Sequence, residues 1–146
     1  RVLFRSETMA VAMTAAETGH LVLSTLHTLG AANTIDRIID VFPPNQQRQI
    51  AVQLSSVLRA VVSQQLVPDV NESLIPAFEI MKTTPAIKNM IRENKVHQID
   101  GLIYSSAGGD MVSMDASLQR LVKEGRITRH EALGHASNPE MLGKRI

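Results

Sequence analysis

The spacing of apolar positions predicts a chain that is mostly helical and is interrupted by short strands. Apolar residues recur every three or four positions in the segments predicted as helices: 7–17, 31–41, 86–94, 96–105 and 114–124. A further helix is predicted to start near Pro44 and to carry an apolar stripe from Ile50 to Val62. Two short helices are predicted after Thr128 and Asn138. Thr84, Ser113 and Thr128 each precede one of these segments, as N-cap residues do. The helical prediction therefore rests on both periodicity and caps.

Two places depart from helical spacing and predict strands. His20–His27 is a short run of apolar and β-branched residues, typical of a buried strand. The runs 65–70 and 74–80 flank the polar residues 71–73 and predict a hairpin, with prolines that favour edge positions or bulges. Since one buried strand cannot cover its own edges, the first part of the chain is expected to be a piece of a larger α/β sheet domain.

Composition removes several classes of protein. The 146 residues carry a net charge of +1, which argues against a dedicated nucleic-acid binder, and 3% aromatic content argues against base stacking. The absence of cysteine excludes disulfides and thiolate zinc sites. No phosphate-binding Gly-x-x-x-x-Gly-Lys-Ser/Thr loop occurs in the sequence.

A polar cluster at the end of the predicted strand is the first candidate site. Thr25, His27 and Thr28 would lie at the carboxyl end of the strand, where open α/β sheets bind ligands. Imidazole and hydroxyl groups can donate hydrogen bonds to phosphate oxygens. On spacing alone, however, a purely structural histidine at a strand end is favoured. His20 would lie on the opposite face from His27, so the two are not expected to share a metal ion.

The segment 86–93, within the helix predicted over residues 86–94, is the second candidate. Ile87, Met90 and Ile91 form its apolar stripe, and outside the stripe Lys88 and Arg92 share a face and repel mildly. An acidic partner would relieve that repulsion, although an ordinary surface helix is the interpretation that the residues alone favour.

Several segments, in order, resemble the secretion and pilus hexameric ATPases. Residues 15–28, with Thr18-Gly19-His20 and Thr25-Leu26-His27-Thr28, are similar to the family's His box. The segments 32–43, 58–64, 79–81 and 86–93 continue the likeness, in particular to the members that retract type IV pili. The resemblance implies the C-terminal half of a RecA-like P-loop ATPase domain over residues 7–83, followed by a small all-helical tail over residues 84–146.

The resemblance also implies roles for individual residues. His20 and His27 would sense the γ-phosphate, with Thr25 and Thr28 near the nucleotide. The retraction motif of the family would comprise Ala86, Ile87, Lys88, Asn89, Met90, Ile91, Arg92 and Glu93, with Lys88 and Met90 in place of the family's Arg and Leu. Lysine keeps the charge but not a bidentate fork.

At the level of the whole protein, the resemblance implies a homo-hexamer that hydrolyses ATP with Mg²⁺. Such a ring would lie in the cytoplasm against the inner membrane, where it would act on the pilus machinery and power twitching motility. Neither zinc nor nucleic acid is expected as a partner.

Residues 1–6 depart from the family pattern and are predicted to be a non-native leader. Val2 stands where the family has its Walker B glutamate, and residues 3–6 match the translation of a common sequencing adapter. Without that glutamate and the phosphate-binding loop, this stretch alone is expected to be inactive. The alternatives are a pilus-assembly or type II secretion ATPase, against which the lack of cysteine argues, a non-catalytic protein that keeps a ring interface, or a helical binding module.

Overall fold

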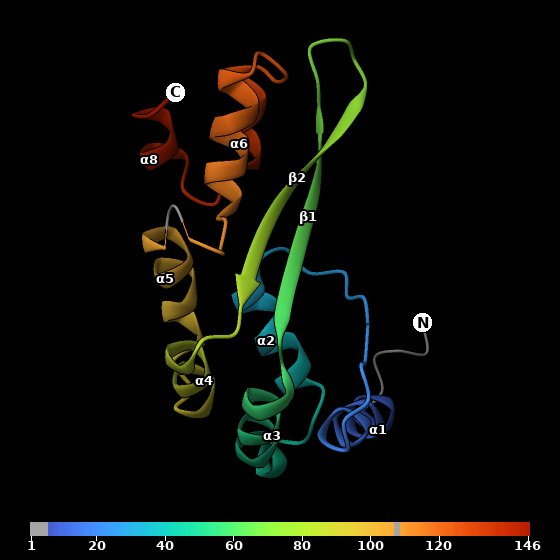
Figure 1. Cartoon of the computed structure of the whole chain (residues 1–146). Helices are drawn as coiled ribbons and strands as arrows, with labels where there is room; N and C mark the ends of the chain where they lie inside the picture. The colour runs from blue at the N-terminus through green and yellow to red at the C-terminus, as the bar shows by residue number, and fades with distance from the viewer. Residues whose placement is uncertain (1–5, 107–108) are drawn as a thin grey trace. The chain divides into compact units, whose positions relative to one another are not determined.

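The computed structural model describes residues 6–106 and 109–146 (Figure 1). Its elements, in chain order, are α1 (Ser6–Glu17), α2 (Ala31–Asp40), α3 (Pro44–Val57), β1 (Ala60–Pro68), β2 (Leu74–Lys82), α4 (Pro85–Arg92), the 3₁₀ helix η1 (Val96–Gln98), α5 (Ile99–Ser105), α6 (Met114–Lys123), α7 (Arg129–His135) and α8 (Pro139–Gly143). Of the predicted leader, only Ser6 lies within the described residues.

Local sequence signals begin most of the later helices. The side chains of Thr84, Ser113, Thr128 and Asn138 each accept a hydrogen bond from the backbone N–H three residues ahead, at the starts of α4, α6, α7 and α8. These bonds satisfy backbone donors that a helix leaves unpaired in its first turn. Gly125, at φ +67°, follows α6 in a conformation that favours glycine.

The strands confirm the predicted hairpin and extend it. β1 and β2 form a long, twisted antiparallel ribbon, visible in Figure 1. Hydrogen bonds at its two ends, from Asp69 N–H to the Ser73 carbonyl and from Thr83 N–H to the Arg59 carbonyl, set the register and place Ser63 opposite Glu79. On the outer edge of β2, Ile80 forms an antiparallel bridge with Val112.

The expected helical stripe from Ile50 to Val62 is wrong at its end. α3 ends at Val57, and the next residue, Leu58, is already extended. Val61 and Val62 belong to β1 instead. Branching at Cβ suits these valines to a strand. Pairing with β2 supplies the hydrogen-bond partners of their backbone.

The expected buried strand at His20–His27 is also wrong for this structure. The segment has no strand assignment, and Leu21 and Leu23 are 84% and 86% exposed. Strand pairing over residues 6–106 and 109–146 is confined to β1 with β2 and to the Ile80–Val112 bridge. Without a neighbouring strand, an apolar run gains neither ladder hydrogen bonds nor burial.

The described residues form two compact units. The first comprises residues 6–28, 32–60 and 82–99, in which α3 packs against α1 and α4. Ile35, Ile50, Leu54, Ile87 and Ile91 are among its buried residues. The predicted boundary at residue 84 stays a prediction.

The second unit comprises residues 29–31, 61–81 and 100–146. One face of the hairpin packs on the C-terminal helices through a single apolar cluster: Val67, Ile75, Ala77, Met114, Leu118, Leu121, Ile127, Ala132 and Leu142. This cluster positions α6 beside β2.

Truncation of Leu118 tests this core. Leu118 is fully buried in the cluster, so Leu118→Ala should lower the free energy of unfolding by about 2–5 kcal/mol. Urea denaturation of the 146-residue chain measures the change. The matched control is Leu66→Ala on the exposed face of β1, which should change stability far less. Equal losses for the two variants would contradict the assigned core.

Candidate functional site

The predicted His-box segment begins at the carboxyl end of α1. His20 Nδ1 lies 3.2 Å from the Ala15 carbonyl oxygen and 3.2 Å from Thr18 Oγ1. Gly19 has φ +95°, which lets the chain turn out of the helix at this point. The imidazole of His20 is thus held against the last turn of α1, and the residue remains exposed.

The segment ends against the start of α2. Thr28 Oγ1 and Thr34 Oγ1 are 2.7 Å apart, and Thr34 is buried. Thr25 and His27 are exposed. α1 therefore holds one end of the predicted nucleotide-proximal segment and α2 holds the other.

The residues directly after Thr28 are held by the hairpin. The backbone N–H of Gly30 donates to Ser63 Oγ at 2.9 Å, and that of Ala31 donates to Glu79 Oε1 at 2.8 Å. Gly30 adopts φ +86°, a conformation that favours glycine. Two consecutive amides are thereby bound by side chains that face each other across β1 and β2.

Glu79 also binds a second helix. Its other oxygen, Oε2, accepts a longer hydrogen bond, 3.4 Å, from the backbone N–H of Met114, the first residue of α6. Glu79 is only 6% exposed, and this burial raises the pKa of its carboxyl group above the ordinary value. The hydrogen bonds from Ala31 and Met114 oppose that rise, whereas the nearby Asp100 and Asp115 carboxylates add to it.

Residue-based reasoning did not single out Ser63 or Glu79 as site residues. A signal for Glu79 existed, because it shares the inward face of β2 with Ile75, Ala77 and Met81. An acid at such an apolar register position must find hydrogen-bond donors. No comparable signal marked Ser63, since a small serine is common on either face of a strand.

The predicted retraction motif occupies α4 and the residue after it. Ile87 and Ile91 are fully buried, whereas Ala86, Asn89, Arg92 and Glu93 are exposed. Lys88 and Met90 are half-buried. The motif therefore presents a polar outer face on a helix whose inner face is anchored.

Two polar contacts orient the end of this helix. Arg92 Nε donates to Ser55 Oγ of α3 at 3.1 Å, and Ser55 Oγ in turn donates to the Val52 carbonyl at 2.6 Å. Glu93 pairs with Lys95 at 2.6 Å, and this hydrogen bond lowers the pKa of the Glu93 carboxyl. Arg92 is thus turned toward Ser55 of α3. The repulsion between Lys88 and Arg92 that the sequence indicates does not predict this contact.

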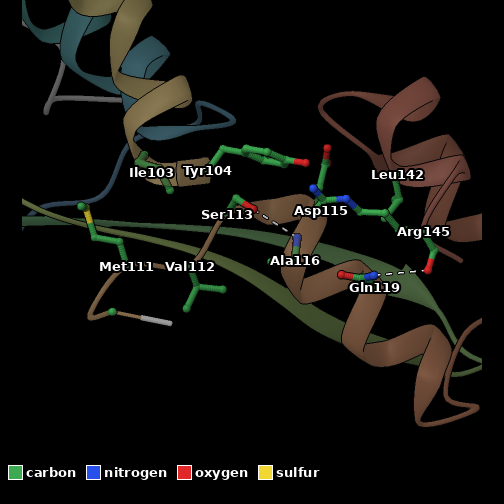
Figure 2. A pocket seen from close by; sticks show the side chains of 11 residues that line it. Ile103, Tyr104, Met111, Val112, Ser113, Asp115, Ala116, Gln119, Leu142 and Arg145 are labelled. Atoms are coloured by element: carbon green, nitrogen blue, oxygen red, sulfur yellow. Dashed lines mark hydrogen bonds between the residues drawn. The ribbon is translucent and has the colours of Figure 1, made fainter. Parts of the chain in front are cut away.

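A cavity of about 300 Å³ lies in the second unit, between α5, α6 and α8 (Figure 2). The Tyr104 hydroxyl beside it is buried and has no hydrogen-bond partner among the described residues. The Arg145 guanidinium lies 4.9 Å from the centre of the Tyr104 ring. The cavity shares none of its lining residues with the predicted site.

The described residues contain neither a metal-binding cluster nor a membrane-spanning helix. Within residues 6–106 and 109–146, no three His, Asp or Glu side chains are grouped so that they could hold a metal ion. Over the same part of the chain, no helix is long and apolar enough to cross a membrane.

Comparison with known proteins gives consistent matches. The family model described as "Type II/IV secretion system protein" matches residues 5–123. The chain is 44% identical over 137 residues to the "Twitching motility protein" of Neisseria gonorrhoeae. The aligned region covers 93% of this chain and 37% of that protein. It is 46% identical over 134 residues to the "Type IV pilus retractation ATPase PilT" of Pseudomonas aeruginosa. The aligned region covers 92% of this chain and 39% of that protein.

A solved structure agrees with these relatives. The chain superposes on the pilus retraction motor PilT with bound ADP at a TM-score of 0.83 and 40% identity, over 94% of this chain and 38% of that one. The mixed α/β architecture expected from the sequence is thereby confirmed. The chain spans less than two-fifths of the length of the relatives it matches.

Titration of Glu79 is a measurable consequence of its burial. Because its pKa is higher in the folded chain than in the unfolded one, its contribution to stability is fully present below the ordinary value of 4.5. That contribution is lost as the pH rises through the raised pKa. We expect the free energy of unfolding of the 146-residue chain, minus that of Glu79→Gln, to fall as the pH rises above 4.5. Urea denaturation across pH measures the difference, and a difference that grows with pH would contradict the assignment.

Proposed function

The chain belongs to the Type II/IV secretion system protein family, and on that premise we propose that it is part of a motor ATPase that powers the retraction of type IV pili. The observation that carries the proposal is the identity of 44–46%, over more than nine-tenths of the chain, to proteins named for twitching motility and pilus retraction. The likeness covers both the His-box segment and α4.

In this proposal, His20 and His27 contact the γ-phosphate of ATP bound to the whole protein. Imidazole N–H groups can donate to phosphate oxygens, and the hydroxyls of Thr25 and Thr28 can do the same. Loss of the γ-phosphate removes these acceptors and releases the segment between α1 and α2. Mg²⁺ would accompany the nucleotide phosphates, and none of the described residues is assigned to it.

The remaining features of the proposal concern the assembly. The subunits form a homo-hexameric ring at the inner face of the cell membrane and act on the pilus machinery there. The outer face of α4, with Lys88 and Asn89, is the part of this chain that transmits force. Its support is the anchoring of α4 through Ile87 and Ile91, which leaves Asn89 exposed and Lys88 half-buried on the polar face.

Substitution of the two histidines tests the nucleotide site. In the full-length gene product, His20→Ala and His27→Ala should each lower kcat for ATP hydrolysis by about 10²-fold, the usual effect of removing one donor to a developing phosphate charge. Steady-state phosphate release measures the rate. The matched control is His97→Ala, an exposed histidine on η1, which should hydrolyse ATP at the wild-type rate. Wild-type kinetics in both His-box variants would contradict their role.

Charge reversal on α4 tests the retraction role. Lys88→Glu should abolish twitching while the purified full-length protein retains wild-type ATP hydrolysis, because α4 acts after nucleotide binding. Lys88→Arg is the matched control and should twitch normally, since it keeps the charge. Cells that carry Lys88→Glu should still bear pili, whereas a bald phenotype would favour the alternative of an assembly motor. Normal twitching with Lys88→Glu would contradict the role of this face.

A further inference from the structure

Two stretches that are distant in sequence, residues 30–31 and the start of α6, converge on two side chains of the hairpin. Ser63 and Glu79 face each other across β1 and β2 and bind the consecutive amides of Gly30 and Ala31, at 2.9 Å and 2.8 Å. The residues 29–31 consequently cluster with the hairpin, whereas residues up to Thr28 cluster with the first unit. Side chains of the hairpin therefore bind the chain directly after the predicted nucleotide-proximal segment.

The carboxylate of Glu79 also binds the first residue of α6. One oxygen holds Ala31 N–H while the other accepts from Met114 N–H at 3.4 Å. A displacement of residues 29–31 must therefore stretch a bond to Glu79 or move the carboxylate relative to α6. A single rigid group thus links the segment after Thr28 to the first turn of α6.

Packing alone does not account for an acid at this position. Ser63 and Glu79 are 4% and 6% exposed, and Ala77 and Met81 beside Glu79 on the same face of β2 are fully buried. Burial of a carboxylate among such neighbours is costly unless donors compensate it. Only a carboxylate offers two acceptor oxygens and no donor, as the two opposed N–H groups require.

We infer that Ser63 and Glu79 are positioning residues for the proposed nucleotide site, which they couple to α6 through the amides of Gly30, Ala31 and Met114. This inference rests on the proposed function, because the state of the nucleotide is what displaces the segment that ends at Thr28. Neither residue touches the nucleotide. They fix where the segment ends and pass its movement to the C-terminal helices.

Glutamine at position 79 is the sharpest test, because it keeps the shape and replaces one acceptor with an NH₂ donor. In the full-length gene product, amide hydrogen exchange is measured with and without a non-hydrolysable ATP analogue. In the wild type, the analogue should change exchange both at residues 29–31 and at residues 114–117. In Glu79→Gln, the analogue should still bind and change residues 29–31, while the change at residues 114–117 is lost.

Steady-state kinetics separate positioning from simple loss of structure. Glu79→Gln should lower kcat severalfold and leave KM for ATP unchanged, since nucleotide contacts are retained. Ser63→Ala provides a second variant with a smaller change in volume, in which the Gly30 amide should exchange faster and the response at residues 114–117 should weaken. The control is Thr128→Ala, which removes the N-cap hydrogen bond that Thr128 Oγ1 accepts from the Glu131 N–H at 3.2 Å, at the start of α7. It should lower stability and keep the response at residues 114–117.

The possible results have distinct meanings. A wild-type protein that neither binds nor hydrolyses ATP would overturn the proposed function and this inference with it. Two results would overturn the inference alone, provided that the wild-type protein hydrolyses ATP. In the first, the wild type shows no response at residues 114–117. In the second, that response survives in both Glu79→Gln and Ser63→Ala.

Discussion

The buried carboxylate of Glu79 is the interaction on which the arrangement of the second unit depends. It accepts backbone hydrogen bonds from the first residues of α2 and α6, which are separated by more than half of the chain. Desolvation opposes the charge and raises the pKa of the group, while the two amides favour the charge. A helix N-terminus carries partial positive charge from its unpaired N–H groups, so two such ends can share one acid.

The apolar cluster between the hairpin and the C-terminal helices supplies the support that this bond needs. Val67, Ile75 and Ala77 lie on the inward face of the ribbon and contact α6 through Met114 and Leu118. Burial in this shared cluster packs β2 against α6. A hydrogen bond across a rigid contact transmits displacement, whereas the same bond across a loose contact would absorb it.

α4 illustrates a different division between anchor and surface. Two fully buried isoleucines hold the helix, and Arg92 reaches Ser55 on α3. Lys88 and Asn89 are left on the outer side, where a partner could bind without disturbing the core. A motif of eight residues therefore combines positions that maintain the fold with positions that are open to function. The family likeness alone does not separate the two kinds.

The local features could be predicted from the sequence because each depends on residues a few positions apart. Thr84, Ser113, Thr128 and Asn138 cap their helices with bonds that span three residues, and the polar residues 71–73 close the hairpin. The prediction failed at His20–His27, since a strand needs neighbours and an apolar pattern does not supply them. It failed again at Val61 and Val62, where pairing with β2 took precedence over helical spacing.

By itself, the sequence determined the order of the helices, most helix starts, the hairpin and, through the order of its motifs, the family to which the chain belongs. It also placed the retraction motif on a helix, whereas it placed His20 and His27 on a strand that the structure does not contain. Only the tertiary structure decided that Ser63 and Glu79 bind the amides after Thr28 and that Arg92 contacts Ser55. The reason is physical: caps and turns are completed by nearby residues, whereas these bonds join residues 33 to 48 positions apart and exist only after the core has brought them together.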